Sequence, residues 1–224
     1  MNQKKEVGEK AVEYVKDGMV VGLGTGSTVF FTISKLGELV KQGLSIKGIP
    51  TSIQTEQLAN QLGIPLVSFT EINQIDIAID GADEVSADLD LIKGGGGALL
   101  REKIIAKAAK TFIVVADSHK LVNKLGSFPL PVEVVPFGVE MTTKYILELG
   151  GAPKLRQKNG SPYLTDNGNY ILDCHIQPII HPEELERDLN MIPGIVDNGL
   201  FVGMADYIIT MNEDKEIDIK IKKR

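Results

Sequence analysis

Short apolar segments alternate with longer amphipathic ones along the first 120 residues of the chain. Four to six apolar residues in a row, bounded by glycine, proline or charged residues, are typical of a strand buried on both faces. The segments between them repeat apolar residues every three or four positions, which indicates helices. We expect strands at 19–23, 46–49, 65–69, 75–79, 91–92 and 111–116, and helices at 2–15, 29–41, 53–62 and 98–110. This alternation predicts an α/β domain with a Rossmann-like, mostly parallel sheet.

The pattern changes after residue 125, where residues 128–131 contain two prolines and form a stiff connector. Beyond the connector, strands are expected at 132–135, 152–156, 170–174 and 195–201, and helices at 139–149 and 183–190. A strand, helix, strand, strand, helix, strand order describes a small ferredoxin-like α+β domain. Strands at 207–211 and 216–221 are expected to return to the first domain. The prediction is a catalytic domain of residues 1–130 plus 205–224, with residues 131–204 inserted into it.

The charge and the residue composition of the chain exclude several classes of binding partner and cofactor. A net charge of −6 argues against a nucleic-acid binder, which needs a basic face. There is no apolar stretch of about 18 residues and no signal-peptide pattern, so we expect no membrane association. The single cysteine, Cys174, fits a reducing cytoplasm, and its alternation with Leu172 predicts a core position. Three histidines without paired spacing predict neither a metal site nor a metal cofactor.

A first glycine-rich loop, residues 24–28, joins the strand 19–23 to the helix 29–41. The free N–H groups of a helix N-terminus bind phosphate, and Ser27 is expected to be the N-cap. The loop lacks the third glycine of a dinucleotide fingerprint and the lysine of a nucleotide P-loop. A small phosphorylated ligand is the simplest interpretation. By the same capping logic, Thr51 and Gln54 are expected to form a capping box that opens the helix 53–62.

A second glycine run, residues 94–97, follows Lys93 and precedes the helix 98–110. Four consecutive glycines indicate positive φ angles or a close backbone approach, and the helix start again favours a phosphate or a developing oxyanion. Glu102 lies one turn into that helix. It is either a general base or a first-turn acid favoured by the helix dipole, and the residues alone leave both open.

Two acids, Asp80 and Asp83, follow the strand 75–79. Aspartates at strand ends often only form turns, but ligands on parallel sheets bind beyond the carboxyl ends of the strands. That rule places the loops 24–28, 80–83, 93–97 and 117–120 on one edge. We therefore favour sugar hydroxyls as the ligands of the two aspartates.

The segments GLGTGSTV, DGADEV, LIKGGGGALLREKII, ADSHKLV, FPLPVEV and TDNGNYILDC stand in this order over nearly the whole chain. Together they resemble ribose-5-phosphate isomerase of the A type. The resemblance implies interconversion of ribose 5-phosphate and ribulose 5-phosphate through an enediolate, in the non-oxidative pentose phosphate pathway. It also implies that the enzyme needs no metal or other cofactor, and that it assembles as a homodimer or possibly a tetramer. The small departures are Gly97, Leu100 and His119, where the family often has alanine, threonine and serine.

The resemblance assigns roles by position. Glu102 would move the proton, with Asp80 and Lys93 as the other catalytic groups. The residues that would contact the substrate are Thr25, Gly26, Ser27, Thr28, Asp80, Gly81, Ala82, Asp83, Lys93, Gly94, Gly95, Gly96 and Lys120. Lys4 is a further candidate for the phosphate. These assignments agree with what the chemistry requires, namely one base that shuttles a proton between two carbons and donors that stabilise the oxygen charge.

Two other classes of function are compatible with parts of the pattern. A sugar-phosphate-binding sensor module on the same fold would keep the phosphate loops, but it would need an output domain. A coenzyme A transferase on a related fold would use a glutamate as nucleophile, but this chain shows no evident adenine site. Ketose formation from ribose 5-phosphate separates the three.

Overall fold

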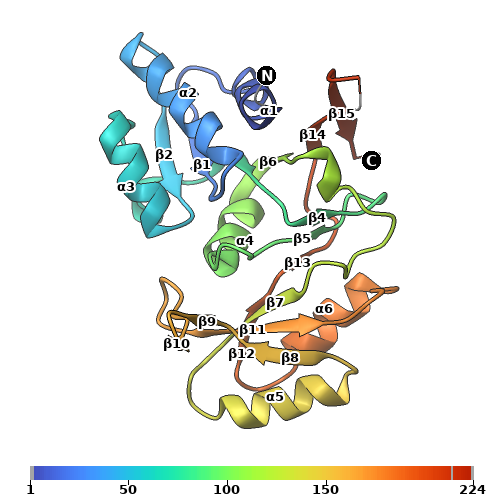
Figure 1. Cartoon of the computed structure of the whole chain (residues 1–224). Coiled ribbons are helices and arrows are strands. Elements are labelled where there is room, and N and C mark those ends of the chain that lie inside the picture. Colours follow the sequence, from blue (N-terminus) through green and yellow to red (C-terminus); the bar gives the residue numbers. More distant parts are fainter. Residues whose placement is uncertain (1–2, 213, 223–224) are drawn as a thin grey trace. The chain divides into compact units, whose positions relative to one another are not determined.

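The computed structural model describes residues 3–212 and 214–222, and the chain divides into two compact units (Figure 1). Unit 1 consists of Met1–Ala82, Arg101–Lys120 and Met204–Arg224. Unit 2 consists of Asp83–Leu100 and Leu121–Gly203. Unit 2 therefore includes residues 83–100 and 121–130 together with the stretch 131–203.

Unit 1 is built on a six-stranded sheet in the order β15-β14-β6-β3-β1-β2. The strands are β1 (Val20–Leu23), β2 (Lys47–Pro50), β3 (Ile75–Asp80), β6 (Ala109–Val115), β14 (Tyr207–Met211) and β15 (Ile217–Ile221). All neighbours pair in parallel except β14 and β15, which form an antiparallel pair. This confirms the prediction of a mostly parallel sheet.

Helices cover both faces of this sheet. They are α1 (Gln3–Val12), α2 (Val29–Lys41), α3 (Ile53–Leu62) and α4 (Leu99–Ala108). Val21 and Ile77 point into one core with residues of α1 and α2. Gly22 points to the other face, where a Cβ would meet Ile105 of α4 at 2.5 Å, so α4 covers that side. Within the described residues, no helix is long and apolar enough to cross a membrane.

Unit 2 contains a four-stranded antiparallel sheet in the order β12-β7-β11-β8. Its strands and helices, in chain order, are β7 (Leu130–Val134), α5 (Val139–Glu148), β8 (Ala152–Leu155), β11 (Tyr170–His175), α6 (Pro182–Asn190) and β12 (Ile195–Asn198). Counted along these four strands, the order is fourth-first-third-second. The ferredoxin-like assignment stays a prediction. Cys174 is fully buried in the core, as predicted, and burial raises the pKa of its thiol to about 12.

A short hairpin and a small three-stranded sheet also belong to unit 2. A hairpin of β9 (Gln157–Lys158) and β10 (Ser161–Pro162) lies between β8 and β11 in the chain. A small antiparallel sheet has the order β13-β5-β4, with β4 (Glu84–Val85), β5 (Leu91–Ile92) and β13 (Leu200–Phe201). The predicted strand 195–201 is therefore two strands, because Gly199 lets the chain leave β7 and pair with β5.

Three other local predictions are wrong in detail. The stretch 65–69 pairs only through Leu66, because a capping box between Ser68 and Glu71 starts the 3-10 turn η1 (Phe69–Glu71). Thr28, without a side-chain cap, precedes α2 in place of Ser27. Ser52, whose Oγ accepts from the Thr55 N–H at 3.1 Å, caps α3 in place of Thr51.

Candidate active site

The carboxyl ends of β1 and β3 define a switch point in the sheet of unit 1. The chain leaves β1 to form β2 on one side, and β3 then pairs with the opposite side of β1. In open α/β sheets, ligands bind in the crevice at such a point. The loop 24–28 follows β1 and Asp80 ends β3, so the topology brings two of the predicted site segments together.

Gly24 and Asp80 are in close contact at this point. A Cβ on Gly24 would lie 2.6 Å from the Cα of Asp80, and closer still to its carboxylate, so only glycine fits. Asp80 Oδ1 accepts hydrogen bonds from the N–H of Thr25 at 3.0 Å and of Gly81 at 2.7 Å. Asp80 is 3% exposed. The carboxylate is thus held in one orientation at the end of the strand.

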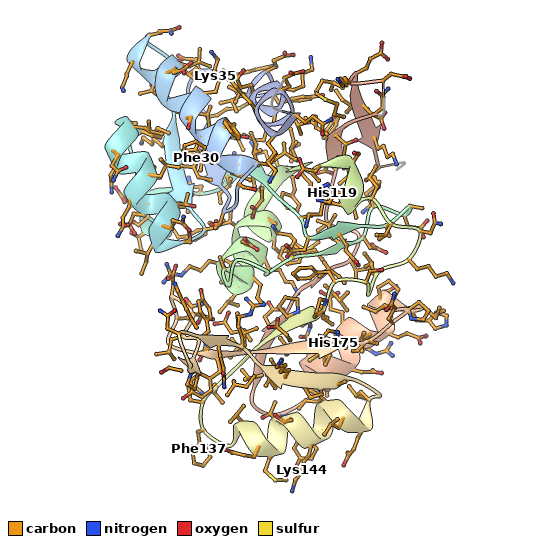
Figure 2. All side chains as sticks on the ribbon, in the orientation of Figure 1. Phe30, Lys35, His119, Phe137, Lys144 and His175 are labelled. Carbon is orange, nitrogen blue, oxygen red and sulfur yellow. The ribbon has the colours of Figure 1, made fainter. Side chains whose placement is uncertain are left out.

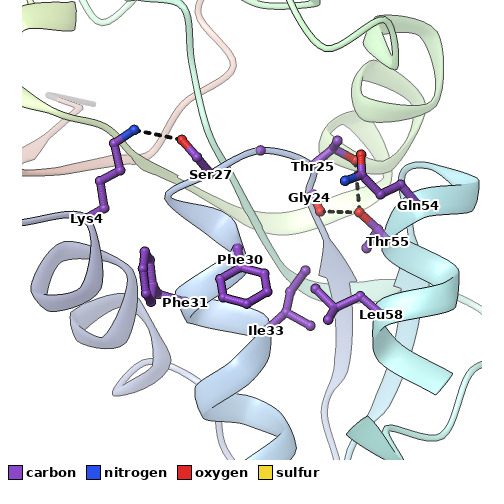
Figure 3. A pocket seen from close by; sticks show the side chains of 11 residues that line it. Lys4, Gly24, Thr25, Ser27, Phe30, Phe31, Ile33, Gln54, Thr55 and Leu58 are labelled. Atoms are coloured by element: carbon purple, nitrogen blue, oxygen red, sulfur yellow. Dashed lines mark hydrogen bonds between the residues drawn. The ribbon is translucent and has the colours of Figure 1, made fainter. Parts of the chain in front are cut away.

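The hydroxyl of Thr25 anchors the loop to α3. Its Oγ1 lies 2.7 Å from Thr51 Oγ1, 2.8 Å from Ser52 Oγ and 3.0 Å from Thr55 Oγ1. Thr55 Oγ1 also donates to the carbonyl of Gly24 at 2.8 Å (Figure 3). The side chain of Thr25 therefore fixes the loop, and its predicted substrate contact stays a prediction.

Lys4 approaches the other end of the loop. Its Nζ donates to Ser27 Oγ at 2.9 Å (Figure 3) and lies 3.6 Å from Asp117 Oδ2. Lys4 and Ser27 line a pocket of about 510 Å³ on unit 1, with Phe30 and Leu58 on its apolar side. Lys4 is thereby brought to the predicted phosphate loop by the fold of α1. Lys120 ends the 3-10 turn η2 (Ser118–Lys120), and its N–H donates to the carbonyl of Asp117 at 2.9 Å.

Glu102 is the fourth residue of α4 and is only 4% exposed. Ile105 and Ala106, on the same side of the helix, are buried as well, whereas Arg101 is partly exposed. Burial excludes the interpretation of Glu102 as half of a solvated charge stripe. A buried carboxylate is costly and is therefore a candidate functional group, so the role of Glu102 as general base stays a prediction.

Lys93 follows β5 in unit 2 and is 2% exposed. Its N–H donates to the carbonyl of Gly199 at 2.9 Å. Its ammonium lies 5.4 Å from the centroid of the Phe201 ring, within the range of a cation–π contact. These contacts place a fixed positive charge directly before the glycine run.

The glycine run is held by residues from two other parts of unit 2, Asp83 before it and the segment 156–163 after it. The N–H of Gly95 donates to Asp83 Oδ2 at 2.7 Å, which brings this predicted pair together. Arg156 donates to the carbonyls of Gly94 and Gly95, and Tyr163 donates to that of Gly96. Sequence reasoning missed these two residues, because no local motif connects them to glycines some 60 positions earlier.

The three histidines lie in different parts of the chain. His119 lies in η2 and His175 ends β11 (Figure 2), and His181 precedes α6. Over residues 3–212 and 214–222, no three His, Cys, Asp or Glu side chains are grouped so that they could hold a metal ion.

Comparison with known proteins identifies the family. The sequence profile of ribose 5-phosphate isomerase A (phosphoriboisomerase A) matches residues 47–215. This chain belongs to the ribose 5-phosphate isomerase A family. Ribose-5-phosphate isomerase A of Bacillus mycoides (strain KBAB4) is 52% identical over 219 residues, which cover 96% of this chain and 99% of that protein. The protein of the same description from Listeria innocua is 52% identical over 224 residues, covering 100% of both chains.

Solved structures of the family have the same fold. A D-ribose-5-phosphate isomerase in complex with phospho-erythronic acid matches with a TM-score of 0.95 and 40% identity, over 99% of this chain and 100% of that one. Ribose 5-phosphate isomerase from Plasmodium falciparum matches with a TM-score of 0.96 and 40% identity, over 99% of each chain. The fold class expected for this chain is therefore that of the ribose 5-phosphate isomerase A family.

Proposed function

We propose that Glu102 carries the proton in the isomerisation that this chain catalyses as a member of the ribose 5-phosphate isomerase A family. The reaction interconverts ribose 5-phosphate and ribulose 5-phosphate. The observation that carries the assignment is the burial of Glu102 in the first turn of α4, a helix that begins two residues after Gly97. A carboxylate there has the apolar setting that makes it a base, and the neighbouring N–H groups suit an anionic ligand.

The proton balance needs only one base. The carboxylate of Glu102 removes the hydrogen at C2 of the open-chain aldose, and the electron pair forms the C1–C2 double bond as the C1 carbonyl oxygen becomes anionic. The same group then returns the proton to C1, and the hydroxyl proton on O2 transfers to O1, leaving the carbonyl at C2. Lys93 and the N–H groups of the glycine run stabilise the oxygen charge between the two transfers.

The remaining groups bind and open the sugar. Asp80, fixed by two N–H donors, accepts the proton of the ring hydroxyl and delivers it to the ring oxygen as the furanose opens. Asp83 binds a sugar hydroxyl. The phosphate lies at the loop 24–28, where Ser27 is within hydrogen-bond distance of Lys4, and Lys120 contributes a second cation. A phosphorylated pentose would therefore place its phosphate at the loop 24–28 and its reacting carbons, C1 and C2, at the acids.

Among the rival functions, a sensor binds the sugar phosphate without turning it over, and a coenzyme A transferase forms a covalent intermediate on its glutamate. Membership of an isomerase family and the buried Glu102 both favour turnover. Incubation with ribose 5-phosphate and detection of the ketose distinguishes the three. We also expect turnover without added cofactor, activity that survives a chelator, and a homodimer or tetramer by native mass measurement.

The decisive variant is Glu102→Gln, which keeps the size and helix position of the side chain but cannot accept the proton. We expect turnover to fall by about a hundredfold or more, the lower range for a positioned general base, with little change in affinity for ribose 5-phosphate. The matched control is Glu140→Gln, an exposed first-turn acid of α5, which should keep full activity.

Exchange with solvent deuterium gives an independent measurement. The wild type should incorporate deuterium at C1 or C2 during turnover, and the Glu102→Gln variant should not do so at a comparable rate. Exchange at near wild-type speed in the variant would mean that Glu102 is a structural residue, and that Asp80 or Asp83 is the base.

A further inference from the structure

The glycine run of unit 2 is closely packed against Asp83 and Tyr163. Gly94 and Gly97 have φ angles of +102° and +83°, which side chains rarely adopt. A Cβ on Gly95 would lie 2.6 Å from Asp83 Oδ1, and one on Gly97 would lie 2.6 Å from Cε1 of Tyr163. The run is therefore a packed turn with a defined orientation for each peptide group.

Arg156 connects this turn to the sheet of unit 2. Its Nη1 donates to the carbonyl of Gly94 at 3.0 Å and to that of Gly95 at 3.1 Å. Its Nε and Nη2 donate to the two carboxylate oxygens of Asp173 on β11, at 2.9 and 2.5 Å. The guanidinium is planar, so its pairing with Asp173 also fixes the direction of Nη1.

The ring of Tyr163 reinforces the arrangement. Its centroid lies 5.9 Å from the Arg156 guanidinium carbon, and its hydroxyl is 3.4 Å from the carbonyl of Gly96. Three successive glycine carbonyls, at 94, 95 and 96, thus accept from side chains of the segment 156–163. In these hydrogen bonds the side chains bind the carbonyls of the turn and not its N–H groups.

Because the peptide group is planar, the direction of each held carbonyl also sets the direction of the N–H of the following residue. In a trans peptide the C=O and N–H point in opposite directions. Arg156 holds the carbonyl of Gly94, and the N–H of Gly95 does point the other way, to Asp83 Oδ2 at 2.7 Å. By the same geometry, holding the carbonyl of Gly95 directs the N–H of Gly96 away from Arg156.

We propose that Arg156 is a positioning residue for the isomerisation, which orients the 95–96 peptide so that the Gly96 N–H faces the oxygen that becomes anionic in the enediolate. Asp173 neutralises the guanidinium, so Arg156 acts through the orientation of the peptide and not as a second cation. This inference rests on the proposed function, in which the N–H groups of the glycine run stabilise that oxygen. The alternative is a purely structural role, in which the pairing of the guanidinium with Asp173 only attaches residue 156 to β11.

Kinetics of Arg156→Ala separate the two roles. Loss of one oriented oxyanion donor costs about a hundredfold in kcat when complete, and a displaced donor costs less. We expect kcat to fall by about ten- to a hundredfold and KM for ribose 5-phosphate to change less than about threefold. Lys158→Ala removes an exposed cation from the neighbouring β9 and should leave both constants unchanged.

Chemical rescue provides a readout that a structural role would not affect. Arg156, Asp173 and Gly95 line a pocket of about 700 Å³ on unit 2, so free guanidinium has access to the vacated position. Guanidinium, at concentrations far below those that unfold proteins, should restore part of kcat in Arg156→Ala and should not activate Lys158→Ala. Folded Arg156→Ala enzyme with wild-type kcat, or a low kcat that guanidinium does not raise, overturns the proposal.

Arg156→Lys decides the question if the alanine variant does not fold. The ammonium keeps the charge beside Asp173 but lacks the planar fork, so kcat should still fall about tenfold at unchanged thermal stability; wild-type kcat in this variant overturns the proposal. Failure of the proposed function is distinguishable, because then the wild type itself forms no ketose or Glu102→Gln remains active.

Discussion

Gly24→Ala tests how closely the ends of β1 and β3 approach. Neither Gly24 nor its matched control, Gly81, has a positive φ, so alanine is compatible with the backbone at both positions. The difference is space. The new Cβ at position 24 would lie 2.6 Å from the Cα of Asp80, whereas at position 81 its nearest neighbour would be Val29 Cγ2 at 3.7 Å. Only the first substitution forces two strands of the sheet apart.

The magnitude follows from the contacts at Asp80. Carbon atoms pack at about 3.5–4.0 Å, so relief of the clash needs a shift of about 1 Å in backbone that no rotamer change can provide. Overpacking of this kind costs about 1–3 kcal/mol. The shift also disrupts the hydrogen bonds from Thr25 and Gly81 to the Asp80 carboxylate, worth about 1.5–3 kcal/mol each. We expect a loss of about 3 kcal/mol or more.

Thermal unfolding followed by circular dichroism measures this loss. For a chain of this length, 1 kcal/mol corresponds to about 2–4 °C, so Gly24→Ala should lower the Tm by about 6–12 °C. Gly81→Ala should leave the Tm within a few degrees of the wild type or raise it slightly, because alanine restricts the unfolded chain. A Tm of Gly24→Ala within about 2 °C of the wild type would refute the close approach and, with it, the fixed position of Asp80.

Two further predictions address the phosphate loop and acid stability. Ser27→Glu places a carboxylate beside Lys4 at the predicted phosphate position, and it should weaken binding of ribose 5-phosphate far more than binding of unphosphorylated ribose; equal losses by calorimetry would place the phosphate elsewhere. The N–H of Val20, with help from Lys110, holds the pKa of Asp76 below its ordinary value of about 3.9. The carboxylate therefore contributes stability above that pH, and this contribution is lost as the pH falls through its folded-state pKa. In urea unfolding, the difference in free energy of unfolding between the wild type and Asp76→Asn should shrink from pH 5 to pH 2.5. A constant difference would contradict the assignment.

Local pattern was sufficient for most elements of the fold. The bounds of α2, α3 and β14 agree with the predicted ranges, because apolar periodicity reports which side of an element is buried whatever it packs against. The errors lie where a distant contact changes a local preference. Ser27 is a good N-cap by type, yet its hydroxyl accepts from Lys4, 23 residues away, and the Thr51 hydroxyl shares a hydrogen bond with that of Thr25.

In the candidate site, too, local pattern predicted some features and distant contacts decided others. The chain by itself determined the glycine runs and the acids Asp80, Asp83 and Glu102, because turns, helix starts and strand ends are local and carry their residue types with them. Only the tertiary structure decided that Gly24 lies against Asp80 and that Glu102 is buried. It alone also brought in Arg156, since a guanidinium that binds carbonyls about 60 residues away leaves no periodicity or motif in the sequence. Burial and long-range hydrogen bonds depend on which elements pack together, and a single sequence encodes that packing only through the whole fold.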